Sequence, residues 1–175
     1  MEKHREELYS LIGRTVILFQ RYEYTFKSLL IRSLIVGTAD TLKENFEERS
    51  LKIRKKSLGQ LVAMYIDEFV TAENNTDVLD SDIYSSQFSI RVSMILDSIS
   101  KDEMKKMYKS LVDDRNFVIH HLITELIPHD ALSYQTMITK LSAINQKFEL
   151  NLENLLIFHE AVSEGYRQLI EAQRR

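Results

Sequence analysis

A chain of 175 residues is long enough to bury a sizeable core, and 44% hydrophobic with 28% charged residues is typical of a folded protein. Only four glycines and one proline are present, too few for the many tight turns of a sandwich or barrel. The absence of cysteine excludes a disulfide scaffold and a thiolate metal site, and the net charge of −3 argues against a general nucleic-acid coat. We therefore expect an all-α protein, with residues 1–175 as a single helical domain.

The first helix is predicted from about Lys3 to Val36, with Gly37 as its C-terminal stop. Glu23 falls inside its apolar stripe, where a lone charge is costly and needs a partner. The apolar residues of the stripe recur at helical spacing and are Ile12, Val16, Phe19, Phe26 and Leu30.

The middle of the chain shows weaker patterns. A short helix is expected over Leu42 to Glu48, and Ser57 with Gln60 forms a capping-box pattern that opens another helix. Near residues 88–94, apolar and polar residues alternate, which indicates one short extended segment.

A third helix is predicted from about Ser100, a capping residue with Glu103 three positions later, to Ile127 before Pro128. Arg115 lies in the middle of its apolar stripe. We expect Arg115 to pair with Glu23, either to fix the register of two helices or to orient Arg115 toward a functional site.

The last segment, from about Asp130 to Ala172, keeps the helical pattern longest, as one helix or as two broken near residues 149–151. His159 lies in its apolar stripe and is expected to be a satisfied core residue. Together the patterns predict a helical bundle with two or three long antiparallel helices.

The candidate site is formed by Arg115, Asn116 and His120. Asn116 and His120 are four residues apart on a helix and share a face, which the long stem of Arg115 can reach. Imidazole can exchange a proton with a ribose 2′-hydroxyl, and guanidinium binds phosphate. These groups suit metal-independent phosphodiester chemistry, and the sequence offers no convincing metal-ligand set or cofactor motif.

The run Arg115-Asn116-Phe117-Val118-Ile119-His120 resembles the Arg-x(4–6)-His motif of the HEPN domain family. Residues 12–23 are similar to the first helix of some bacterial HEPN-like proteins, and residues from 115 onward to their second half. The resemblance implies a homodimer that joins two motifs in one RNA-cleaving site, with Arg115, Asn116 and His120 as the catalytic residues. Glu23 supports this site if it orients Arg115, as its place in the apolar stripe suggests. It also implies a toxin–antitoxin or anti-phage defence role, with an antitoxin or regulatory protein as partner. One subgroup has tyrosine two positions after the motif histidine, where this chain has Leu122.

A second interpretation remains open, namely a non-catalytic helical module that dimerises or binds a partner protein. The basic residues Lys52, Arg54, Lys55 and Lys56 are either a solvated face or contacts to RNA phosphates. No stretch approaches the ~18 apolar residues of a membrane helix, and the first ten residues do not resemble a secretory signal. We therefore expect a cytoplasmic protein without a membrane partner.

Overall fold

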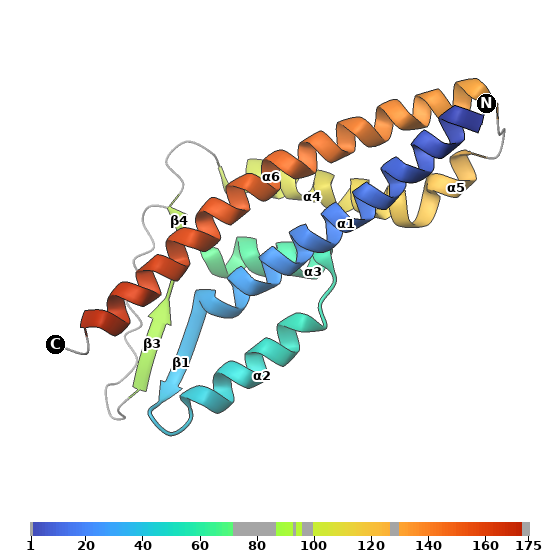
Figure 1. The fold of residues 1–175 in the computed structure, drawn as a ribbon. Coiled ribbons are helices and arrows are strands. Elements are labelled where there is room, and N and C mark those ends of the chain that lie inside the picture. The colour runs from blue at the N-terminus through green and yellow to red at the C-terminus, as the bar shows by residue number, and fades with distance from the viewer. Residues whose placement is uncertain (1, 72–86, 93, 96–99, 127–129, 173–175) are drawn as a thin grey trace. The chain divides into compact units, whose positions relative to one another are not determined.

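A computed structural model of the chain describes residues 2–71, 87–92, 94–95, 100–126 and 130–172. The predicted all-α class is confirmed, because most of the described residues lie in helices (Figure 1). The strands form two short two-stranded ladders, in which β1 pairs with β3 antiparallel and β2 pairs with β4 parallel. None of the described helices is both long and apolar enough to cross a membrane. In chain order the elements are α1 (Glu2–Ser33), β1 (Leu34–Thr38), α2 (Leu42–Arg54), α3 (Leu58–Met64), the π-helical turn η1 (Tyr65–Phe69), β2 (Val70–Thr71), β3 (Gln87–Arg91), β4 (Met94–Ile95), α4 (Lys101–Asn116), the π-helical turn η2 (Phe117–His121), α5 (Leu122–Glu125) and α6 (Ala131–Ala172).

The chain divides into two compact units. The first unit takes in Met1–Thr25 and Ser110–Ile157, and the second takes in Phe26–Lys109 and Phe158–Arg175. Each unit therefore combines segments that are far apart in the sequence.

The core of the first unit forms around Phe148 of α6. Its ring lies 4.5 Å from that of Phe19 and 5.3 Å, edge-on, from that of Tyr22, both on α1. Ion pairs from Lys147 to Asp114 and from Lys140 to Glu125 show that the chain from α4 to α5 runs antiparallel to α6. The expected antiparallel packing is thus found between these segments.

The core of the second unit contains three aromatic rings from three helical elements. Phe26 lies 5.0 Å from Tyr65 and 5.7 Å from Tyr108, and the two tyrosine rings are 5.3 Å apart. Burial raises the pKa of Tyr108, and a hydrogen bond from Tyr65 partly opposes this effect. The mutual edge-on and tilted contacts join α1, η1 and α4 in one aromatic cluster.

The long helices α1 and α6 run parallel to each other, so the expectation of antiparallel long helices is wrong for this pair. In the second unit, Ser28 hydrogen-bonds His159, and Arg32, one turn later, donates to Ser163, one turn beyond His159. Both helices accordingly advance in the same direction, as Figure 1 shows. The hydrogen bond at 2.9 Å also confirms that His159 is a half-buried, satisfied residue.

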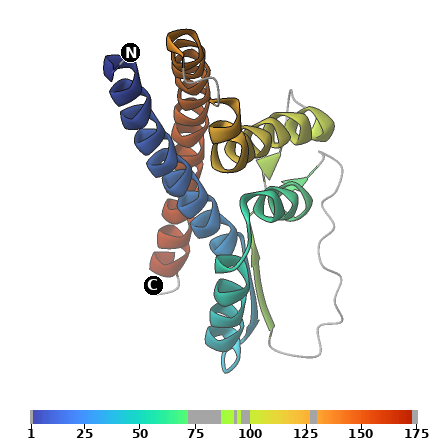
Figure 2. The ribbon, with the colours of Figure 1, turned by 90° about the vertical axis from the view of Figure 1, so that its right-hand side faces the viewer.

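The first helix ends at Ser33, three residues before the predicted end at Val36. Leu34, Ile35 and Val36 enter β1 instead, where they pair with β3 and lie alongside α2 (Figures 1 and 2). A bulky, partly β-branched run packs well on a pleated surface, and pairing with a distant strand decides between helix and strand here. β3 itself confirms the extended segment expected near residues 88–94.

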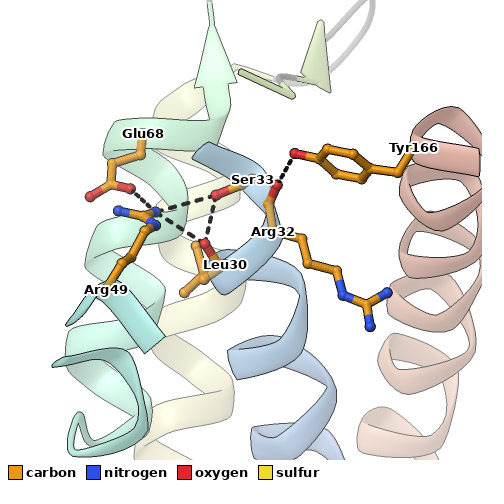
Figure 3. A network of polar contacts seen from close by, with 6 residues as sticks. All are labelled: Leu30, Arg32, Ser33, Arg49, Glu68 and Tyr166. Atoms are coloured by element: carbon orange, nitrogen blue, oxygen red, sulfur yellow. Dashed lines mark hydrogen bonds and ion pairs between the residues drawn. The ribbon is translucent and has the colours of Figure 1, made fainter. Parts of the chain in front are cut away.

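Side chains complete the end of α1. Arg49 Nη2 donates to Leu30 O at 3.0 Å and lies 2.7 Å from a carboxylate oxygen of Glu68, as Figure 3 shows. Ser33 donates to the same Leu30 carbonyl, and the hydroxyl of Tyr166 donates to the carbonyl of Arg32. These donors satisfy carbonyls that the end of a helix leaves without intrahelical partners.

Other helix boundaries follow the predicted caps. Gln60 accepts the backbone N–H of Ser57 at 3.0 Å, and Glu103 accepts that of Ser100 at 2.9 Å, so both capping positions are confirmed. α2 extends to Arg54, beyond the predicted end at Glu48. α6 is one unbroken helix of 42 residues. The predicted end of the third helix at Ile127 lies outside the described residues.

Candidate functional site

The candidate motif lies where α4 passes through the π-helical turn η2 into α5. The backbone N–H of Leu122 bonds to the carbonyl of Phe117, five residues back, instead of four. A π turn wraps one more residue than an α turn and is frequent at functional sites. Arg115 and His120 are five residues apart, so this wider turn brings them nearer to one face than a regular α-helix would.

Arg115 lies, as predicted, within the apolar stripe that runs from α4 through η2 to the end of α5. The six apolar members of that stripe are buried, whereas Arg115 and Asn116 are half-buried; the buried members are Met104, Tyr108, Leu111, Val118, Leu122 and Leu126. Arg115 Nη1 donates to Asn116 Oδ1 at 3.2 Å. The neighbouring amide thus holds the guanidinium.

The predicted ion pair between Arg115 and Glu23 is not observed. Glu23 is half-buried on α1, but within the described part of the chain Arg115 forms no ion pair with any carboxylate. The apolar stripe correctly located both side chains, but it could not show which of them meet. The supporting role assigned to Glu23 stays a prediction.

His120 and His121 are both exposed on η2. Their ring centroids are 6.4 Å apart, and the rings are nearly perpendicular. Among the residues that the structure describes, no hydrogen bond reaches the His120 ring, so Asn116 serves Arg115 and does not orient the imidazole here. The imidazole of His120 is open to a ligand.

Two lysines of α6, which sequence reasoning missed, neutralise the carboxylates around the motif. Lys147 Nζ lies 2.6 Å from Asp114, and Lys140 Nζ lies 3.1 Å from Glu125 and 3.4 Å from the centre of the Phe117 ring. Their spacing of seven residues, which places both on one side of α6, was the available signal. With these acids paired, Arg115 has no carboxylate partner among the residues that the structure describes.

Asp113 is exposed but lies two positions before Arg115. Residues two apart on a helix do not face each other, so this carboxylate points away from the guanidinium. In the described part of the chain, no group of three or more His, Asp or Glu side chains is placed to hold a metal ion.

The basic residues of α2 and the turn after it belong to the second unit, whereas Arg115 belongs to the first. Lys52 pairs with Glu48 at 2.6 Å, Arg54 and Lys55 are exposed, and Lys56 is half-buried. Basic side chains at the C-terminal end of a helix also offset its dipole. Contact of these residues with RNA phosphates stays a prediction.

In comparisons with known proteins, no family model matched the chain, and no curated protein or solved structure matched it either. The resemblance to the HEPN family therefore rests on the motif and its helical context alone.

Proposed function

We propose that Arg115, Asn116 and His120 form a metal-independent RNA-cleaving site, completed by a second copy of the chain. The observation that carries this proposal is the half-buried Arg115, which has no carboxylate partner among the described residues and is followed, across the π-helical turn, by the exposed His120. Withdrawing a cation from water is unfavourable unless an anion compensates, and a phosphodiester supplies that anion.

The chemistry follows from these groups. Neutral His120 takes the proton of a ribose 2′-hydroxyl, whose oxygen attacks the adjacent phosphorus while the bond to the 5′-oxygen breaks. Arg115 stabilises the negative charge that develops on the phosphoryl oxygens, and Asn116 holds the guanidinium in place. The products are a 2′,3′-cyclic phosphate and a 5′-hydroxyl end.

The leaving 5′-oxygen needs a proton at the same stage at which the 2′-hydroxyl loses one. A single imidazole cannot be base and acid at once, so the second proton is assigned to His120 of a second copy. Ile119 and Ile123, one turn apart and 44% and 79% exposed, flank His120 and support a self-complementary contact there.

The same two isoleucines favour the alternative, a non-catalytic module that binds a partner through this surface. In that case His120 has no chemical role and its replacement changes no reaction. From the HEPN resemblance, we also propose a toxin–antitoxin or anti-phage setting, in which an antitoxin or regulatory protein silences the site.

The test is cleavage of a mixed RNA by the purified chain in excess chelator. His120→Ala and Arg115→Ala should each lose about 10²–10⁴-fold in rate, as expected for a lost acid–base or charge-stabilising group. His121→Ala, the exposed neighbour, is the matched control and should stay within about threefold, because it does not share the face of Arg115. Specific activity should rise with protein concentration as dimers form.

Failure of the wild-type chain to cleave RNA, with all variants folded by circular dichroism, would favour the partner-binding module. Equal losses in His121→Ala and His120→Ala would remove the assigned role of His120. Cleavage that chelator abolishes would contradict the metal-independent mechanism.

A further inference from the structure

A pocket of about 340 Å³ opens between β1 and α2, entirely within the second unit. Its volume lies in the ~300–1,000 Å³ range of small-molecule sites. The wall is largely apolar, from Leu34, Val36, Phe46, Ile53 and Met64. Val36 and Phe46 each remain 37% exposed, so a ligand that covers them would remove apolar surface from water.

Three cations, Arg49, Lys52 and Lys56, line the same pocket, together with a single carboxylate, that of Glu48. Two of the cations have acidic partners, since Arg49 pairs with Glu68 outside the lining and Lys52 pairs with Glu48. Lys56 is half-buried and has no ion pair within the residues that the structure describes. The pocket therefore carries one uncompensated positive charge.

Arg49 is also only partly used. All of its hydrogen bonds run through Nη2, and Nη1 forms none among the described residues. Arg49 and Lys56 both line the pocket, so the lining contains a guanidinium nitrogen that no described residue uses and an ammonium without an ion pair among the described residues.

From this combination we infer that the pocket binds a small organic anion with an aliphatic body, of the class of a medium-chain carboxylate. The ligand's carboxylate pairs with the ammonium of Lys56, and its aliphatic chain covers Val36 and Phe46. An inorganic anion would pair with the positive charge but leave the apolar wall exposed to water. A neutral alcohol with an aliphatic chain would cover the apolar wall but leave the positive charge unpaired. Binding at this pocket does not depend on the Arg115 site or on RNA cleavage.

The test is titration of the full chain with octanoate, followed by the backbone amide signals in NMR. Saturable shifts are expected in β1 and α2 at millimolar octanoate. Lys56→Gln should weaken binding about tenfold, because a charge-assisted contact is lost. Lys55→Gln, one residue away and outside the pocket lining, should leave the affinity within about twofold, as expected for a solvated charge.

1-Octanol and inorganic phosphate each should bind at least about tenfold more weakly than octanoate, since each lacks one of the two contributions. The proposal is overturned by the absence of saturable shifts, by shifts confined to other elements, or by equal affinities in the Lys55 and Lys56 variants. Phosphate binding as tightly as octanoate would overturn it too, and would favour the phosphate-contact interpretation of the basic residues.

Discussion

Two ion pairs of α2 have nearly the same length but differ in exposure. Arg49 lies 2.7 Å from Glu68, with side chains 19% and 35% exposed. Lys52 lies 2.6 Å from Glu48, with side chains 69% and 61% exposed. Because water and salt screen exposed charges, we expect the Arg49 pair to stabilise the fold and the Lys52 pair to contribute little.

The expected magnitudes follow from burial and from the number of acceptors. Exposed pairs typically contribute about 0.2–1 kcal/mol. A charge-assisted hydrogen bond shielded from water contributes about 1.5–3 kcal/mol, and we expect this coupling energy between Arg49 and Glu68. Arg49→Met also removes the donor to Leu30 O and Ser33 Oγ, so its total cost should be about 3 kcal/mol of unfolding free energy.

Two double-mutant cycles in urea denaturation measure these quantities. One combines Arg49→Met with Glu68→Gln, and the other combines Lys52→Met with Glu48→Gln. The first coupling should exceed the second by at least about 1 kcal/mol and should be less sensitive to salt. Couplings of equal size, or one below about 0.5 kcal/mol for Arg49 and Glu68, would refute the argument from burial.

Two further predictions concern charged side chains of the helices. Burial and the nearby Arg32 lower the pKa of His159, so its imidazole binds a proton more readily in the unfolded chain than in the folded one. The free energy of unfolding should therefore fall as the pH drops below about 6.5. In His159→Gln, the midpoint of urea denaturation should depend less on pH over this range. An equally steep fall in the variant would assign it to other groups. Arg115→Met should leave stability within about 1 kcal/mol of wild type, because it removes a half-buried cation without a carboxylate partner. A loss above about 2 kcal/mol in the same urea assay would instead show that Arg115 is structural.

The sequence was most informative where the period of apolar residues is unambiguous. The stripe of α4 and the caps at Ser57 and Ser100 are local patterns, and local backbone chemistry is enough to predict them. The end of α1 is different, because residues 34–36 fit a helix or a strand equally well. Only their pairing with β3, far along the chain, decides for the strand, and a local pattern does not contain that information.

The candidate site was predictable in part for the same reason. The spacing of Arg115 and His120 is visible in the sequence, whereas the π turn between them is not, because a five-residue hydrogen bond has no clear residue signature. The lysines of α6 that neutralise Asp114 and Glu125 depend on how two helices pack. Helix periodicity gives the face of a residue but not the partner opposite it.

Arg49 and Arg115 are both half-buried, but they differ in the partners that balance their charges. Arg49 meets Glu68 and two further oxygen acceptors, so its charge is balanced within the fold. Arg115 has the amide of Asn116, which supplies a dipole but no opposite charge. Both lose hydration, yet only the first regains an ionic partner within the described residues. The function that we propose follows from this difference: a phosphodiester would supply the opposite charge for Arg115, and His120, five residues later, would exchange a proton with that phosphodiester's ribose.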